Sequence, residues 1–227
     1  MEHLIELVKR DLHVFLSSNP TFFYNECDLQ MHIAAHLSNS NNYDKIHLEY
    51  FVPKNIIHNE ITQSLVTPSL SYNPQNLYID IVVEKNGEFL PIELKYKTAP
   101  LKQNITRFGE TLDRIDILKN HGARDLGAYD FWRDVSRIEC LIKRFKNVKN
   151  GIVLFVTNDK GYWELPQDGS TPNYANFSMR PGKHGVNKTW QGNTAMSSSR
   201  PSFTVAREYK IKWNTYSTPF QYCLLEI

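Results

Sequence analysis

The chain has few cysteines, no long apolar run and almost no excess charge of either sign. Its three cysteines, Cys27, Cys140 and Cys223, lie far apart and form no C-x-x-C pair, which excludes a disulfide framework and a thiolate metal knuckle. No apolar stretch approaches the roughly 20 residues of a membrane helix, and Glu2 and Glu6 stand where a secretory signal would be hydrophobic. The sequence therefore predicts a soluble, cytoplasmic protein with no membrane partner.

Several catalytic signatures are also missing. No glycine-rich phosphate loop, G-x-S-x-G elbow or reactive-cysteine context occurs, which argues against P-loop nucleotide hydrolysis and acyl transfer. His32 and His36 stand four residues apart, as a zinc pair could, but no third ligand accompanies them, so helix packing is the preferred interpretation. With 26 basic and 24 acidic residues, any attraction for nucleic acid has to come from local clustering of charge.

What is present is the composition of a globular domain, with 227 residues of which 41% are hydrophobic. Apolar spacing predicts helices over 1–18, from an N-cap at Asn25 to about residue 38, over 103–120 and over 129–146. Alternating or uniformly apolar runs predict strands over 46–52, 77–85, 88–97, 151–157, 203–213 and 220–227. The polar stretches 53–74 and 163–201 are interpreted as loops. This order predicts a mixed α/β or α+β domain.

Asn86-Gly87 is the strongest local signal, because this dipeptide favours a two-residue hairpin turn. In such a turn the register places Asp80 opposite Glu93, with their Cβ atoms roughly 5 Å apart. Lys95 shares their face, since side chains alternate along a strand. Two opposed carboxylates repel each other, and a hard divalent cation such as Mg²⁺ would offset that repulsion. Lys95 would then orient or deprotonate an attacking water, or steady the charge that develops on a phosphate.

The alternative interpretation is an exposed polar face with Lys95 as a counter-charge. A third acidic residue favours the interpretation as a metal site. Glu26 lies in the first turn of the second predicted helix, beside the apolar stripe that faces the core. Taken alone, Glu26 would be explained by the helix dipole. The other face of the hairpin is expected to be core, because all of its residues are apolar: Ile79, Ile81, Val83, Leu90, Ile92 and Leu94.

Charged residues also crowd the helix predicted over 129–146. Asp130, Asp134, Arg137 and Glu139 stand at spacings of three and four residues, and such spacing is typical of solvated ion pairs on a helix surface. We therefore expect them to be exposed to water, with Arg137 or Lys143 able to reach a phosphate.

A basic segment lies near the C-terminus. Residues 171–215 hold seven basic residues and one acidic residue, while the whole chain carries a net charge of only +2, so the remainder is net negative. Aromatic residues are interleaved with the basic ones, a pattern that suits contacts with phosphates and unstacked bases. The residues expected to bind nucleic acid are Arg180, Lys183, Lys188, Trp190 and Arg200. A solvated surface loop is the alternative.

Together these motifs resemble the PD-(D/E)XK nuclease superfamily, which has the restriction-endonuclease-like fold. The resemblance covers roughly residues 20–157 and is carried by a helix with Glu26 and Gln30, by the run 77–83 ending in Asp80-Ile81-Val82-Val83, and by Glu93-Leu94-Lys95. It implies that Asp80 and Glu93 bind Mg²⁺, that Lys95 assists the water and that Glu26 adds to the metal site. Two departures are Ile79, where the family name has proline, and the long loop over 53–74.

The resemblance implies a central mixed β-sheet flanked by helices. Residues 1–165 would form the nuclease core, and 166–227 a basic, loop-rich C-terminal elaboration of the same domain. The function implied is Mg²⁺-dependent hydrolysis of phosphodiester bonds in nucleic acid, DNA in the first place, with Mn²⁺ as a substitute metal and a homodimer left open. The alternatives are an inactive nucleic-acid-binding or assembly protein of the same fold, and a structural domain that binds a protein partner.

Overall fold

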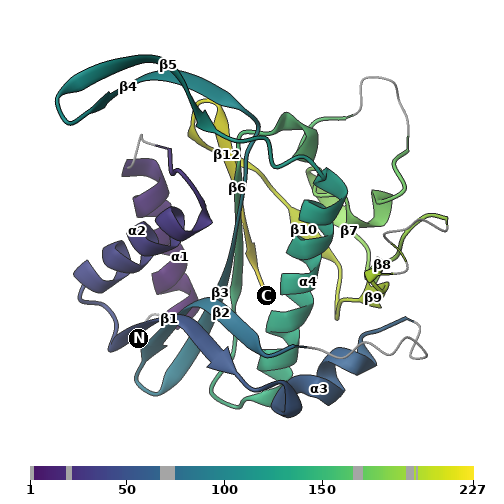
Figure 1. Cartoon of the computed structure of the whole chain (residues 1–227). Helices are drawn as coiled ribbons and strands as arrows, with labels where there is room; N and C mark the ends of the chain where they lie inside the picture. Colours follow the sequence, from purple (N-terminus) through teal and green to yellow (C-terminus); the bar gives the residue numbers. More distant parts are fainter. Residues whose placement is uncertain (1–2, 19–21, 67–74, 166–170, 193–196, 198) are drawn as a thin grey trace.

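The computed structural model describes residues 3–18, 22–66, 75–165, 171–192, 197 and 199–227 (Figure 1). The α-helices are α1 (Leu4–Ser18), α2 (Glu26–Asn39), α3 (Lys54–Gln63) and α4 (Arg124–Arg144). The first six strands are β1 (Lys45–Val52), β2 (Leu77–Lys85), β3 (Glu88–Lys97), β4 (Leu101–Arg107), β5 (Glu110–Leu118) and β6 (Ile152–Thr157). The later strands are β7 (Gly182–His184), β8 (Asn187–Lys188), β9 (Phe203–Thr204), β10 (Tyr209–Ile211), β11 (Asn214–Ser217) and β12 (Phe220–Glu226).

Six strands form the central sheet, in the order β1-β2-β3-β6-β12-β11. β3 and β6 run parallel and the other neighbours run antiparallel, so the sheet is mixed. Helices α1 and α2 cover one face and α4 covers the other (Figure 1). The predicted mixed α/β class with flanking helices is therefore confirmed. None of the helices among the described residues is long and apolar enough to cross a membrane.

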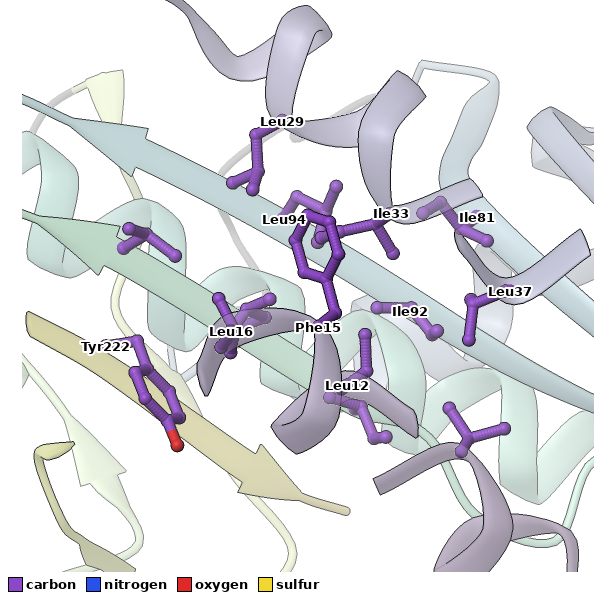
Figure 2. Close-up of a cluster of buried hydrophobic side chains, with 14 of the residues drawn as sticks. Leu12, Phe15, Leu16, Leu29, Ile33, Leu37, Ile81, Ile92, Leu94 and Tyr222 are labelled. Carbon is purple, nitrogen blue, oxygen red and sulfur yellow. The ribbon is translucent and has the colours of Figure 1, made fainter. Parts of the chain in front are cut away.

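The apolar stripes of α1 and α2 pack on the first face of the sheet (Figure 2). Leu12 and Phe15 of α1 meet Ile33 of α2 over Ile92 and Leu94 of β3, and all five side chains are buried. Burial of such side chains contributes roughly 1.5 to 3 kcal/mol each relative to exposure. This packing fixes the position of α2, and with it the N-terminal turn that carries Glu26.

The hairpin register expected from Asn86-Gly87 is confirmed. Both turn residues have positive φ, +52° and +75°, and β2 pairs with β3 in the expected register as far as Ile81 opposite Ile92. One expectation about its apolar face is wrong. Ile79 packs with Val82 in the cluster under α3, whereas Ile81 and Val83 face α1 and α2. The alternation of faces breaks beside Asp80, where the neighbouring strand β1 has Glu49 at a φ of +48°.

The helix predicted over 103–120 is wrong, because this segment is the hairpin of β4 and β5. The turn lies at Phe108 and Gly109, whose φ values are +52° and +86°. Figure 1 shows the hairpin extending away from the sheet beyond the end of β3. The segment is mostly exposed, so little apolar packing forces a helix, and its β-branched residues favour strands.

The loop predicted over 53–74 contains a helix, α3, at Lys54–Gln63. Pro53 occupies the N-cap position, and Ile57 and Ile61 lie one turn apart and are both buried. That pair follows the helical period, so the signal was in the sequence. Residues 67–74 of the predicted loop lie outside the described residues.

The described part of the basic C-terminal segment, residues 171–192, 197 and 199–215, packs against the outer side of α4 through its apolar side chains and is not a solvated loop throughout. Its buried side chains include Phe177, Met179, Phe203 and Val205, which join Trp132 of α4 in one apolar cluster. The strand predicted over 203–213 is broken into the short strands β9 and β10, and the one predicted over 220–227 is confirmed as β12. β12 pairs with β6 along its length, which places the end of the chain in the central sheet.

Candidate active site

The site begins with the N-terminus of α2. The Asn25 side chain accepts a hydrogen bond from the backbone N–H of Asp28 (2.9 Å), and the Asp28 carboxylate accepts one from the backbone N–H of Tyr24 (2.9 Å). This reciprocal cap ends the loop and starts the helix at Glu26, as the sequence predicted. Glu26 is thereby held in the first turn, directed at the edge of β3.

Two carboxylates then complete the hydrogen bonding of β3. The backbone pairing of β2 and β3 ends at Ile81 and Ile92. Beyond this point the Leu94 N–H donates to Asp80 Oδ2 (2.6 Å), and the Tyr96 N–H donates to Glu26 Oε2 (2.7 Å). Side-chain oxygens thus replace the backbone acceptors that a continuing strand would supply. Asp80 and Glu26 are brought to the same strand edge by this local divergence.

Gln30 ties the same point to β1. Its Nε2 donates to the backbone oxygen of Asp80 (2.7 Å) and to Glu49 Oε1 (2.8 Å). Gln30 is buried and lies one turn after Glu26 on α2. Gln30 therefore contacts the backbone of Asp80, while Glu26 contacts the edge of β3. This contact fixes the backbone of Asp80 at the position where the side chains of β2 stop alternating regularly between the two faces of the sheet.

Glu93 lies on the α4 side of the sheet and is almost completely buried, with 2% of its surface exposed. Its Oε1 has no hydrogen-bond partner among the described residues. Burial, followed by the nearby carboxylates of Asp134 and Asp80, raises the pKa of Glu93 well above its ordinary value. A buried carboxyl oxygen without a partner is costly, and this one lies where a metal ligand is expected.

Lys95 Nζ lies 2.8 Å from Asp134 Oδ2 and donates to the backbone oxygen of Leu94 (2.9 Å). The second oxygen of Asp134, Oδ1, accepts from Arg137 (2.9 Å), and Asp134 is only 1% exposed. Burial lowers the pKa of Lys95, but the carboxylates of Asp134, Glu93, Glu26 and Asp80 outweigh it and raise the pKa above its ordinary value. In this arrangement Lys95 is a cation that is paired with Asp134 and donates a hydrogen bond to Leu94.

The remaining electrostatics show an excess of acid. Burial raises the pKa of Asp80 to about 6, with Asp134 and Glu26 adding to the shift, and Lys95 and the Leu94 N–H opposing it. Asp130 also has a raised pKa, from burial and from Asp134. The carboxyl groups of this cluster are those of Glu26, Asp80, Glu93, Asp130 and Asp134, and its central cations are Lys95 and Arg137.

This donor set fits a hard divalent cation. Mg²⁺ is held by one or two carboxylates and several waters, and the unpartnered oxygen of Glu93 and the raised pKa of Asp80 mark the two candidates. Among the described residues, no group of three or more His, Cys, Asp or Glu side chains is placed to hold a metal ion together. The predicted three-carboxylate set is not grouped around one point in the described residues; Glu26 Oε2 accepts from the Tyr96 N–H, and a role for Glu26 at the metal stays a prediction.

Asp134 is the site residue that the sequence analysis missed. It was expected to form a solvated pair, and the structure corrects this: Asp134 is buried and paired with Lys95. Glu139 is also not solvated, since it accepts hydrogen bonds from the Ala206 N–H and the Tyr209 hydroxyl. The buried apolar residues on both sides of Asp134 are the only sequence signal that this part of α4 lies inside the fold.

The basic residues expected to bind nucleic acid do not form one exposed group. Lys188 is fully buried over the Trp132 ring, and Trp190 is 8% exposed and stacked on Tyr129, so neither is available to a phosphate or a base. Lys183 is exposed and Arg180 and Arg200 are partly exposed. Of these, Arg200 acts on the candidate site, because its charge opposes the raised pKa of Asp130.

The two histidines of α2 take part in packing, as the sequence predicted. His32 lies against the Phe23 ring and His36 against the Phe15 ring, with centroid distances of 5.3 and 5.4 Å. Their ring nitrogens contact different groups: His32 Nδ1 the backbone oxygen of Asp28, and His36 Nε2 that of Asp11.

A scan against models of protein families, a search of the curated proteins and a search of the solved structures each found no match to this chain.

Glu26 offers a test that separates a metal role from a structural one. Glu26→Gln keeps an oxygen that can accept from the Tyr96 N–H, so we expect its stability to stay within about 0.5 kcal/mol of wild type. If the carboxylate reaches a metal, the Mg²⁺ concentration for half-maximal cleavage should rise several-fold. Glu26→Ala removes the acceptor and should also lose about 1 to 2 kcal/mol. A Mg²⁺ titration of Glu26→Gln identical to that of wild type would assign Glu26 to structure alone.

Proposed function

We propose that this protein is a Mg²⁺-dependent nuclease that hydrolyses phosphodiester bonds of nucleic acid, with DNA as the first substrate to test. One observation carries the proposal: Asp80, Glu93 and Lys95 converge where β2 leaves β3, and Glu93 has a buried carboxyl oxygen without a hydrogen-bond partner among the described residues. A surface charge cluster would be solvated, whereas this one is mostly buried and rich in acid.

Each residue has a definite role in the proposal. Asp80 and Glu93 would hold Mg²⁺, with Glu26 as an additional ligand or a tuning charge. The metal would supply Lewis-acid polarisation of the phosphate and a water of lowered pKa. Lys95, as a cation beside these carboxylates, would orient the attacking water and stabilise the charge that develops on the phosphate oxygens. Electrostatic stabilisation of this kind is the main contribution of the protein in phosphoryl chemistry.

The second candidate is a nucleic-acid-binding or assembly protein of the same fold that does not cleave. The observation that favours it is the engagement of the candidate groups by the protein itself. Asp80 and Glu26 accept from backbone N–H groups of β3, and Lys95 is paired with Asp134. In this alternative the carboxylates serve to complete the edge of β3.

The test is cleavage of plasmid, single-stranded DNA, branched DNA and RNA by the purified chain, with Mg²⁺, with Mn²⁺ and with EDTA. Metal-dependent products from at least one substrate, absent with EDTA, are expected. Binding without cleavage in either metal would support the second candidate. If the chain neither binds nor cleaves any of these substrates, both candidate functions are contradicted and a structural role is favoured.

The exposed basic residues carry a further prediction about binding. Changing Arg180, Lys183 and Arg200 together to Gln should weaken nucleic-acid affinity about equally across sequences. Each lost phosphate contact should flatten the log–log dependence of affinity on salt by roughly 0.7 to 0.9. The matched control changes Lys45, Lys54 and Lys149, three exposed lysines outside the basic segment, to Gln. Equal affinity and equal salt slopes for the two triple variants would rule out the basic segment as the binding surface.

A further inference from the structure

The candidate lysine is held by an acid from a different part of the chain. Lys95 lies on β3, in the middle of the sheet, and Asp134 lies on α4, which packs across the face that Glu93 and Lys95 share. The Nζ–Oδ2 distance is 2.8 Å, and the side chains of Lys95 and Asp134 are 14% and 1% exposed. A pair with this burial is screened far less by water and salt than a surface ion pair.

Both carboxylate oxygens of Asp134 contact a basic side chain, Oδ2 that of Lys95 and Oδ1 that of Arg137. Its Oδ1 accepts from Arg137, one turn further along α4. The residues beside it on the helix, Arg133 and Val135, are buried, and Phe131 and Ile138 pack in the apolar cluster under α4. The carboxylate therefore has little freedom to move, and its Oδ2 is a fixed point for the ammonium of Lys95.

The number of hydrogen-bond donors on Lys95 then becomes informative. A lysine ammonium has three N–H donors. One is donated to the backbone oxygen of Leu94, and the ammonium forms a close ion pair with Asp134 Oδ2, without hydrogen-bond geometry. Donors not used by Leu94 are left for another group, and the adjacent carboxyls of Asp80 and Glu93 mark the side on which a metal-bound water or a phosphate oxygen would lie.

We infer that Asp134 is a positioning residue, whose buried ion pair fixes the ammonium of Lys95 so that an N–H donor not used by Leu94 faces the reacting phosphate. This inference rests on the proposed nuclease function, because only a phosphate or water at Asp80 and Glu93 gives that donor a partner. Asp134 contacts Lys95 and Arg137, not the metal or the substrate. Its effect should therefore be on the rate of the chemical step and not on substrate binding.

The kinetic test uses two changes at the same residue. Asp134→Ala removes the contact, and we expect kcat to fall about 100-fold, the scale of misplacing a reacting group by about 1 Å. Asp134→Asn keeps the shape of the side chain without its charge, and kcat should fall about tenfold, since the amide can still accept from the ammonium but the ion pair is lost. KM for the nucleic acid should stay within about threefold in both, as for an interaction made only in the transition state.

Two controls show whether the effect passes through Lys95. The double variant Lys95→Ala/Asp134→Ala should be no slower than Lys95→Ala alone, because the positioned group is already missing. Glu139→Gln, on the same helix, alters contacts to Tyr209 and Ala206 but not to Lys95, and should keep the wild-type rate. Asp134→Ala with wild-type kcat, or a double variant markedly slower than Lys95→Ala, would overturn the inference.

A second readout does not need activity. In protein labelled with ¹⁵N-lysine, the buried Lys95 ammonium, held by the Leu94 hydrogen bond and the Asp134 ion pair, should exchange slowly enough to give its own proton signal, identified by its loss in Lys95→Arg. The signal should vanish in Asp134→Ala and persist in Glu139→Gln. If wild type cleaves no substrate, the proposed function fails, while this signal still decides whether Asp134 holds the ammonium. An unchanged signal in Asp134→Ala would contradict the positioning role even in an active protein.

Discussion

Purified Glu93→Gln, Asp80→Asn and Lys95→Ala proteins are each expected to lose Mg²⁺-dependent cleavage by about 10³-fold or more, as for groups that act as a unit in stabilising transition-state charge. The substitutions at the two acids keep the shape of the side chain. Glu93→Gln leaves the buried volume unchanged, and Asp80→Asn can still accept from the Leu94 N–H. The measurement is the single-turnover rate at saturating Mg²⁺, with circular dichroism as the check on folding.

The matched control is Glu84→Gln, a carboxyl group on the same strand that contacts His47 and lies outside the site. It should keep the wild-type rate. The double variant Asp80→Asn/Glu93→Gln should be scarcely slower than either single variant, because removing one ligand already disables the site. A wild-type rate in any of the three single variants would end the proposed mechanism, and independent, multiplying losses would show that the groups do not share one metal.

The core of the candidate site could be derived from the sequence because one turn fixes it. Asn86 and Gly87 both adopt positive φ, which only a few residues do readily, and this sets the register of the whole hairpin. The pairing of Ile81 with Ile92 follows, and the predicted pair of Asp80 with Glu93 lies one position beyond the last pair of this ladder. The cap at Asn25 is equally local, and it predicts where Glu26 begins its helix.

What the sequence could not supply depends on packing between distant segments. Asp134 has the same spacing to Arg137 whether the helix face is solvated or buried, so its pairing with Lys95 is decided only when α4 packs on the sheet. The local sequence also does not predict where β2 diverges from β3. It therefore cannot predict that the carboxylates of Asp80 and Glu26 accept hydrogen bonds from backbone N–H groups of β3. Short-range rules give the register of a hairpin but not the point at which its strands separate.

The two largest fold errors have different physical origins. Residues 103–120 contain apolar residues at spacings that fit a helix, but the segment is mostly exposed, and the local Phe108-Gly109 turn and β-branched residues favour a hairpin. The basic segment contains many Gly, Asn and Ser residues, yet its scattered aromatic and aliphatic side chains are buried against α4. Only in this second segment does long-range packing outweigh the local pattern.

The buried Lys188 leads to the prediction with the largest effect on stability. Its Nζ lies 3.5 Å from the centroid of the Trp132 ring, is fully buried and has no hydrogen-bond partner among the described residues. Burial lowers the pKa of Lys188 from 10.5 to about 7, which corresponds to about 5 kcal/mol at 1.4 kcal/mol per pH unit. The cation–π contact with Trp132 recovers about 1 to 2 kcal/mol of the cost of the charged form. Lys188→Met, with a similar apolar volume, should therefore raise the free energy of unfolding by about 3 to 4 kcal/mol at pH 6.

The pH dependence of this gain distinguishes it from better packing. Between pH 7 and 10.5 the unfolded lysine binds a proton that the folded one does not, so wild-type stability gains a positive slope with pH from this residue. Lys188→Met lacks that slope, and its advantage should shrink steadily from pH 7 to pH 10.5. His184, the titratable neighbour, has a pKa lowered by burial and by Lys188 and changes charge below this window. Urea unfolding at several pH values gives the comparison, with the exposed Lys183→Met as control. A constant difference between Lys188→Met and wild type across that range would show that the ammonium is not the source of the cost.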